Sequence, residues 1–258
     1  MTKTDFSPQE MMVIAASREL RNNETVIVGI GLPVLSALLA QRTHAPRLIM
    51  IYESGVIDAK PTRPALTMGD PALATGASMI VDFFDGYALF LQRGMIDVGF
   101  VGGAQVDMYG NVNSTVIGDY SNPKVRLPGS GGACEIAEMA GRVIIIMPHE
   151  KRRFVEKVDF ITSPGFLGPG KNRKNEGLRG AGPSAVVSTL GVFRFDSNGV
   201  MYVDAIHPGA SVEQIRANTG WDIQVGPDAK ETKPPTTLEL NVLRNEIDPR
   251  RVFLGKLD

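Results

Sequence analysis

Residues 25–55, with the sequence TVIVGIGLPVLSALLAQRTHAPRLIMIYESG, contain the pattern that decides the fold. The β-branched run Thr25–Gly29 predicts a strand, because branched side chains favour extended backbone. The turn Gly29-Ile-Gly31-Leu-Pro33 ends it, and a helical pattern of apolar residues follows to Arg42. The run Arg47–Tyr52 predicts a second buried strand. Strand, helix and strand in this order indicate a βαβ unit with a right-handed crossover.

Glu53 follows the second strand directly and opens the tight turn Glu53-Ser54-Gly55. Open α/β sheets bind their ligands at the carboxyl ends of the strands. A carboxylate at that position can act as a base, a metal ligand or a covalent nucleophile. Pairing with a nearby Lys or Arg is the competing structural explanation.

The rest of the chain continues the alternation of strands and helices, and no composition change marks a domain boundary. We therefore expect one α/β domain over residues 1–258. Ser7-Pro8-Gln9-Glu10 forms a capping-box pattern before a helix to Leu20. The further expected strands are Val98–Val101, Val143–Pro148, Phe160–Ser163, Ala185–Ser188 and Val192–Phe195. The further expected helices are Asp82–Gln92, Glu135–Ala140, Ser211–Asn218 and Thr237–Ile247. Asn198-Gly199 indicates a type I′ hairpin, and Lys60–Gly76 a long functional loop.

Composition and charge exclude several protein classes. The net charge of −1 offers no electrostatic basis for binding nucleic acid or an anionic membrane. No apolar run approaches the length of a membrane span. Cys134 is the only cysteine, so no intrachain disulfide can form, which suits a cytoplasmic protein.

Three partial motifs are too incomplete to assign a site. The 29–34 turn lacks the third glycine of a dinucleotide fingerprint. Gly165–Lys171 matches a phosphate-binding loop, but Asn172 replaces its Ser or Thr, and a basic loop is the simpler interpretation. His149-Glu150 has no second His four residues on, and the histidines are scattered, so we expect no metal site. No Gly-x-Ser-x-Gly nucleophile motif occurs.

Two glycine clusters are candidates for binding a ligand through backbone N–H groups. Gly102-Gly103-Ala104-Gln105 follows a predicted strand, and Gly129-Ser130-Gly131-Gly132-Ala133 precedes a short helix. Consecutive glycines leave N–H groups open to an oxyanion. A loop that only packs closely would use the same residues.

Taken together, these segments resemble the B (β) subunit of a family I CoA-transferase, of the glutaconate or 3-oxoadipate type. The resemblance covers nearly the whole chain. It rests on Gly29–Pro33, Ile51–Gly55, Gly102–Gln105, Asp107–Asn113, Ile117–Tyr120, Gly129–Ala133, His149–Phe154 and Thr162–Gly165. It implies a three-layer α/β/α fold with an open, mostly parallel sheet of the CoA-transferase/NagB-like kind.

The resemblance also implies the chemistry of the site. Glu53 matches the family's covalent nucleophile, and Tyr52 and Ser54 fit the glutaconate and oxoadipate branch. Gly132 is the expected oxyanion donor. The residues expected to bind acyl-CoA are Gly29, Gly31, Gly102, Gly103, Gln105, Gly131 and Ala133. Ser54 and Arg126 are expected to bind the acid substrate, and Arg63, Arg126, Lys124 and Gln105 are the candidates for binding its second carboxylate.

Coenzyme A and acyl-CoA are then substrates, and no cofactor is permanently bound. A partner A subunit would provide the other wall of the active site in an α2β2 or larger assembly. The acid itself stays open between the glutaconate and 3-oxoadipate classes, the second of which belongs to the breakdown of aromatic compounds. An acyl-CoA hydrolase or decarboxylase on the same fold, and a non-catalytic acyl-CoA-binding subunit, are the alternatives.

Overall fold

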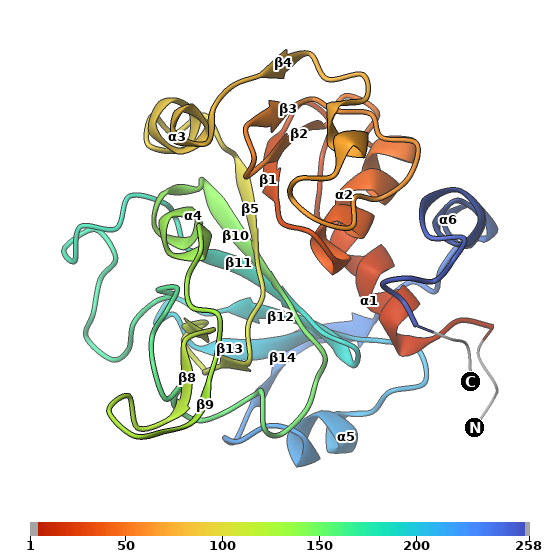
Figure 1. Ribbon diagram of the computed structural model, residues 1–258. Coiled ribbons are helices and arrows are strands. Elements are labelled where there is room, and N and C mark those ends of the chain that lie inside the picture. Colours follow the sequence, from red (N-terminus) through yellow and green to blue (C-terminus); the bar gives the residue numbers. More distant parts are fainter. Residues whose placement is uncertain (1–4, 256–258) are drawn as a thin grey trace.

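A ten-stranded open sheet spans the computed structural model, which describes residues 5–255 (Figure 1). The strand order is β14-β13-β12-β11-β10-β5-β1-β2-β3-β4. The central neighbours β11, β10, β5, β1 and β2 are parallel, and antiparallel pairs flank them on both sides. The strands are β1 (Thr25–Val28), β2 (Ile49–Tyr52), β3 (Val56–Ile57), β4 (Met79–Ile80), β5 (Val98–Val101), β10 (Arg142–Ile146), β11 (Pro183–Val187), β12 (Gly191–Phe195), β13 (Met201–Ile206) and β14 (Gln224–Glu231).

Helices cover both faces of this sheet, which confirms the three-layer α/β/α fold. One face packs against α1 (Pro8–Ser17), α2 (Leu32–Arg42), and α6 (Thr237–Asn241) with its π-helical continuation η3 (Val242–Ile247). The other face packs against η2 (Gly86–Leu91), which continues α3 (Phe83–Asp85), and against α4 (Ala133–Met139) and α5 (Val212–Ala217). Successive strand residues enter opposite cores, as strand geometry requires: Val26 and Val28 join the first core and Ile27 the second.

Short local elements complete the fold. The turn η1 (Pro71–Ala74) lies in the loop between β3 and β4. Two small antiparallel sheets pair β6 (Gln105–Val106) with β7 (Val112–Asn113), and β8 (Val116–Gly118) with β9 (Pro123–Arg126). No helix within residues 5–255 is long and apolar enough to cross a membrane.

The capping box of residues 7–10 forms as the sequence predicts, and its Glu10 ties α1 to the segment that follows α6. Ser7 accepts a hydrogen bond from the Glu10 N–H, and the Glu10 carboxylate accepts one from the Ser7 N–H. Burial disfavours ionised Glu10, but hydrogen bonds from Arg244, Ser7 and Arg251 outweigh burial and lower its pKa to about 2. Both arginines lie beyond α6 in the sequence, so this buried carboxylate fastens α1 to the C-terminal segment.

Two local predictions are wrong. Residues 160–163 form no strand, because only Ser163 makes an isolated bridge, to Val112. The β12–β13 hairpin exists, but only Gly199 has a positive φ (+73°), whereas a type I′ turn needs two such residues. Residues 60–76 form a loop as predicted, and it contains η1, which Asp70 caps while pairing with Arg63 at 2.6 Å.

Tyr52 lies fully buried under α2, and its hydroxyl has no hydrogen-bond partner within residues 5–255. An unsatisfied buried hydroxyl lowers stability, so we expect Tyr52→Phe to stabilise the fold by about 1 kcal/mol. Urea unfolding measures this difference. Tyr120→Phe is the control, because Tyr120 is exposed, and its variant should unfold like the wild type. A Tyr52→Phe protein that unfolds at lower urea would contradict the expectation.

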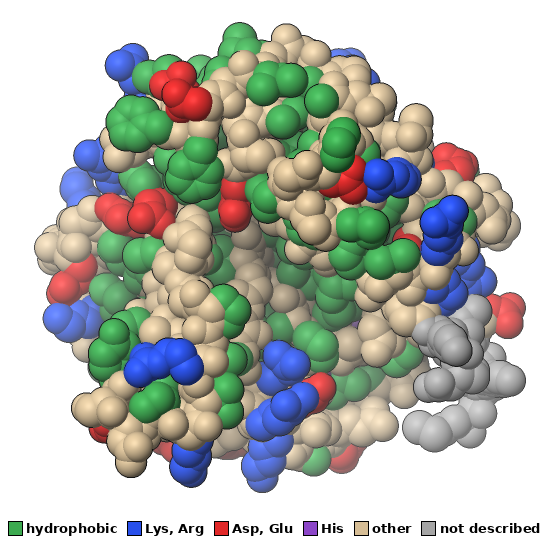
Figure 2. Space-filling view, viewed as in Figure 1, with side chains coloured by type: hydrophobic (Ala, Val, Ile, Leu, Met, Phe, Trp, Pro, Cys, Tyr) green, Lys and Arg blue, Asp and Glu red, His purple; other side chains and the backbone are tan. Residues whose placement is uncertain are grey.

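A group of hydrophobic side chains remains exposed over α3, at the upper left of the space-filling view (Figure 2). Its residues are Met79, Ile80, Phe83, Phe84 and Leu89. We call this group the 79–89 face.

Candidate functional site

The carboxyl ends of four neighbouring parallel strands meet at one cleft. Glu53 follows β2, Gly29 follows β1, Gly102 follows β5, and Ile146 ends β10. The cleft measures about 250 Å³. Its lining consists of Gly29, Ile30, Leu32, Pro33, Glu53, Phe100, Val101, Gly102, Ala133, Ile136 and Ile146. This is the position that open α/β sheets use for ligands.

Glu53 is the only ionisable residue in this lining. A turn fixes it, in which the Gly55 N–H donates to the Tyr52 carbonyl at 2.9 Å. The carboxylate lies over Gly29, where an added Cβ would be 4.0 Å from Glu53 Oε1. Gly29 therefore leaves open the space beside the carboxylate.

The Glu53 carboxylate has no hydrogen-bond or ion-pair partner within residues 5–255. Burial raises its pKa above the ordinary 4.5. Glu53 is therefore not a carboxylate held at the strand end by an ion pair with Lys or Arg, which was the competing structural explanation. A desolvated, unpaired carboxylate is a more reactive nucleophile or base than a solvated one.

The glycine cluster 129–133 forms the N-terminus of α4 and brings Ala133 into the cleft. Gly132 is the N-cap residue, and its N–H meets no acceptor in the described part of the chain. Gly131 adopts a positive φ of +52° and is exposed. Neither Gly131 nor Gly132 belongs to the cleft lining, and the N–H groups of Gly129 and Ala133 donate to the Ser114 and Ser130 carbonyls. Within residues 5–255, only Ser130, Gly131 and Gly132 of this cluster keep N–H groups without an acceptor.

Tyr87 is a site neighbour that no sequence pattern singles out. Its ring lies so close to Gly132 that a Cβ added there would be 1.7 Å from the Tyr87 hydroxyl oxygen. That hydroxyl is buried with no hydrogen-bond partner in residues 5–255. Burial and the charges of Glu53 and Glu135 raise the tyrosine pKa. Gly132 is therefore required for Tyr87 to pack beside the α4 N-terminus.

The second half of the first glycine cluster does not reach the cleft lining. Gly103 packs against Val112 and Asn113, where an added Cβ would clash. Gln105 is buried, and its side chain donates to Asp159 at 3.0 Å and accepts from Asn113 at 2.7 Å. The Gln105 side chain therefore stabilises the local fold through these hydrogen bonds. Gly31 is the N-cap residue of α2, with a φ of +114°, and lies outside the cleft lining.

The cationic candidates also lie away from the cleft lining. Arg126 and Lys124 are exposed on β9, where Arg126 donates to the Tyr120 carbonyl at 3.0 Å and covers the Tyr120 ring. Arg63 is paired with Asp70. Ser54 stays beside Glu53 in the turn, and its buried hydroxyl has no partner among residues 5–255.

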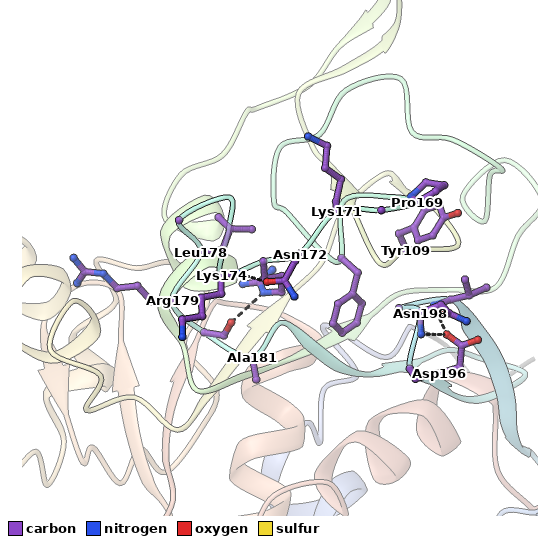
Figure 3. Close-up of a pocket in the computed structure, with 18 residues that line it drawn as sticks. Tyr109, Pro169, Lys171, Asn172, Lys174, Leu178, Arg179, Ala181, Asp196 and Asn198 are labelled. Carbon is purple, nitrogen blue, oxygen red and sulfur yellow. Dashed lines mark hydrogen bonds between the residues drawn. The ribbon is translucent and has the colours of Figure 1, made fainter.

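A larger cleft, of about 1030 Å³, lies between the 166–181 loop and the β12–β13 hairpin (Figure 3). Lys171 of the partial phosphate-binding motif pairs with Glu176 at 2.8 Å, and no helix follows it. The buried Arg173 donates to the Ala137 carbonyl at 2.7 Å, near the C-terminal end of α4. This cleft therefore adjoins the end of α4 opposite to Gly132.

His149 is structural. It is buried and stacked on Phe154 with 3.8 Å between ring centroids. Its ring nitrogens lie 3.0 Å from the Ser188 hydroxyl and 3.1 Å from the Thr219 hydroxyl. Burial lowers its pKa to about 3. Over residues 5–255, no group of three His, Cys, Asp or Glu side chains is placed to hold a metal.

Comparisons with known proteins extend over nearly the whole chain. A family model described as coenzyme A transferase matches residues 9–218. The chain is 48% identical over 240 residues to the B subunit of 3-oxoadipate CoA-transferase from Pseudomonas knackmussii, with 93% of this chain and 92% of that one covered. It is 40% identical over 258 residues to the B subunit of glutaconate CoA-transferase from Acidaminococcus fermentans, with 97% and 96% covered. The crystal structure of glutaconate coenzyme A-transferase from Acidaminococcus fermentans matches with a TM-score of 0.92 at 37% identity, over 98% of this chain and 99% of that one.

Proposed function

This chain belongs to the coenzyme A transferase family, and we propose that it is the B subunit of a heteromeric enzyme whose covalent nucleophile is Glu53. The enzyme moves CoA from an acyl-CoA to a carboxylic acid of the 3-oxoadipate or glutaconate class. Two similar proteins support this proposal, because they are named as the B subunits of 3-oxoadipate CoA-transferase and glutaconate CoA-transferase. The observation that carries the proposal is an unpaired, desolvated carboxylate in a cleft at the strand ends.

The chemistry explains why a carboxylate is needed. Glu53 attacks the thioester carbonyl of the donor, the C–S bond breaks, and CoA leaves as a thiolate with the electron pair. The products are a mixed anhydride and free CoA. The thiolate then attacks the Glu53 carbonyl, which releases the donor acid and leaves a glutamyl-CoA thioester. The acceptor carboxylate runs the same steps in reverse and regenerates Glu53, so the kinetics are ping-pong.

Each of these steps passes through an oxyanion that needs hydrogen-bond donors. The unpaired Gly132 N–H at the start of α4 is our candidate donor. Losing one such donor typically costs about 2.7–4 kcal/mol of barrier. Gly29, Gly102 and Ala133 line the cleft and leave room for the acyl-thioester. Water must be excluded, because both covalent intermediates hydrolyse.

Borohydride trapping tests the proposal. The chain is purified with its A subunit, incubated with acyl-CoA without an acceptor acid, and reduced with borohydride. Peptide mass mapping should then find the Glu53 side chain converted to an alcohol. Glu53→Gln is the negative control. Free CoA accumulating over an unmodified Glu53 would instead support the acyl-CoA hydrolase alternative.

The raised pKa of Glu53 predicts the pH dependence of turnover. Only the carboxylate form attacks, so kcat/KM should fall as the pH drops through a pKa above 4.5. A pH–rate profile of the complex measures this acid limb. If the rate fell only below pH 4.5, the pKa of Glu53 would not be raised, and its carboxylate could not be desolvated in the free enzyme.

The same shift predicts an effect on stability. A carboxyl whose pKa is raised on folding favours the folded state when protonated, and this contribution is lost as the pH rises through the folded pKa. Glu53→Gln removes the buried charge. The variant should therefore be more stable than the wild type at neutral pH, and the difference should shrink below pH 4.5. Urea unfolding at two pH values measures it.

A further inference from the structure

The hydroxyl of Tyr87 is a buried hydrogen-bond donor that has no acceptor anywhere in residues 5–255. The packing of the ring does not require this hydroxyl. Phe83 of the 79–89 face contacts the ring with 5.0 Å between ring centroids, and a phenylalanine at position 87 would make the same contact. A buried hydroxyl without a partner lowers stability. Such groups are uncommon in folded proteins, and some of them serve catalysis.

Tyr87 lies between two parts of the Glu53 site. On one side, the preceding residue Gly86 packs on the turn after Glu53, where a Cβ added to Gly86 would be 3.9 Å from the Gly55 Cα. On the other side, the Tyr87 hydroxyl fills the space that a Cβ of Gly132 would need, since the two atoms would be 1.7 Å apart. Gly132 is the N-cap of α4, whose first residue lines the cleft.

The acceptor that this donor serves belongs to the protein. A bound acyl group cannot reach the hydroxyl, because Tyr87 is not part of the cleft lining and its hydroxyl oxygen is buried. Burial and the negative charges of Glu53 and Glu135 raise the tyrosine pKa, so the hydroxyl stays protonated and both carboxylates act on it. Glu135 is exposed to water, whereas Glu53 lies in the cleft. Glu53 is therefore the acceptor that lacks solvent.

We propose that Tyr87 donates a hydrogen bond to the Glu53 side-chain oxygen when that oxygen becomes an oxyanion, an inference that rests on the proposed function. The CoA thiolate adds to the Glu53 carbonyl carbon of the anhydride, a C–S bond forms, and the carbonyl electron pair moves onto the Glu53 oxygen. The C–O bond to the donor acid then breaks, the acid leaves as a carboxylate with that electron pair, and the Glu53 carbonyl forms again. The Tyr87 proton stays on its oxygen throughout.

The lack of this hydrogen bond in the free chain is what makes the hydroxyl useful. Only an interaction that is stronger in the transition state than in the ground state raises kcat. No hydrogen bond joins Tyr87 to Glu53 in the part of the chain that the structure describes, so the resting carboxylate is not made less reactive. Catalytic hydrogen bonds often tighten only as the reaction proceeds. The hydroxyl therefore lowers the barrier without strengthening substrate binding.

The experiment compares CoA transfer by the wild-type and Tyr87→Phe chains, each purified with its A subunit. The substitution removes the hydroxyl and keeps the ring. Tyr202→Phe is the matched control, since Tyr202 is also half-buried and lies on β13, towards the opposite edge of the sheet from β2. Two further measurements separate catalysis from structure. Urea unfolding of each complex gives its stability, and the Kd of the donor acyl-CoA is measured in Glu53→Gln complexes with and without Tyr87→Phe.

We expect Tyr87→Phe to lower kcat about 10²–10³-fold, the usual effect of losing one oxyanion donor. The urea midpoint should stay the same or rise, the acyl-CoA Kd should not change, and Tyr202→Phe should keep wild-type kcat. Wild-type kcat in Tyr87→Phe, beside an inactive Glu53→Gln complex, would overturn the role of Tyr87 and leave the transferase function standing.

Two other results would also contradict the inference. A lower kcat accompanied by a lower urea midpoint or a weaker acyl-CoA Kd would overturn it, because the hydroxyl would then support the fold or hold the substrate. A wild-type complex that transfers no CoA would overturn the proposed function itself, and the inference with it.

Discussion

Glu53→Gln is expected to reduce CoA transfer by at least about 10⁴-fold in kcat while the complex still assembles. The neutral amide lacks the carboxylate oxygen that attacks the thioester, so neither the anhydride nor the glutamyl-CoA thioester can form. Loss of a covalent nucleophile costs on the order of 10⁶-fold in kcat in a well-studied hydrolase. Initial rates with an acyl-CoA donor and a free acid acceptor measure the loss.

Two further variants separate chemistry from structure. Glu53→Asp keeps the carboxylate but shortens the side chain by one methylene, so it should fold and still lose most turnover through misplacement of the attacking oxygen. Glu156→Gln makes the matching Glu-to-Gln change at an exposed loop carboxylate and should retain full activity. Near-normal turnover in Glu53→Asp would remove Glu53 from the role of nucleophile.

The sequence predicted a helix or strand correctly where all local signals in a segment indicated the same type of element. The run of residues 25–52 predicted β1, α2 and β2, because β-branched runs, a glycine turn and helical spacing all agreed there. The 160–163 segment was misread for a physical reason. Its short apolar run lies in a loop, and Val112 supplies only an isolated bridge, a tertiary contact that periodicity does not report.

The candidate site was predictable only in part for a similar reason. Its position at a strand end singled out Glu53, but the pattern alone also fitted an ion-paired carboxylate, and the role of nucleophile came from the family resemblance. Gln105 and Arg126 could not be judged, since their partners Asp159 and Tyr120 are set by tertiary packing. Tyr87 meets Gly132 only through the packing of η2 beside α4, and their long separation in the sequence conceals that contact.

Gly55→Ala is expected to be the most damaging single-methyl change near the cleft. Gly55 has a φ of +86°, which costs a residue with a Cβ about 1–2 kcal/mol. The new Cβ would also lie 2.2 Å from the Val81 carbonyl oxygen and 2.9 Å from that of Asp82. Backbone atoms cannot rotate aside as a side chain can, so the 81–82 segment must shift. We expect a loss of about 3 kcal/mol or more in the free energy of unfolding.

Gly94→Ala isolates the steric part of this effect. Gly94 has a comparable φ of +72°, but no atom lies within 4 Å of an added Cβ. Its variant should lose only about 1–2 kcal/mol, the backbone share. If both variants lost the same free energy of unfolding, residues 81–82 would be able to move away from the new Cβ at little energetic cost. A larger loss in Gly55→Ala, together with reduced turnover, would show that one close backbone contact holds the nucleophile turn in place.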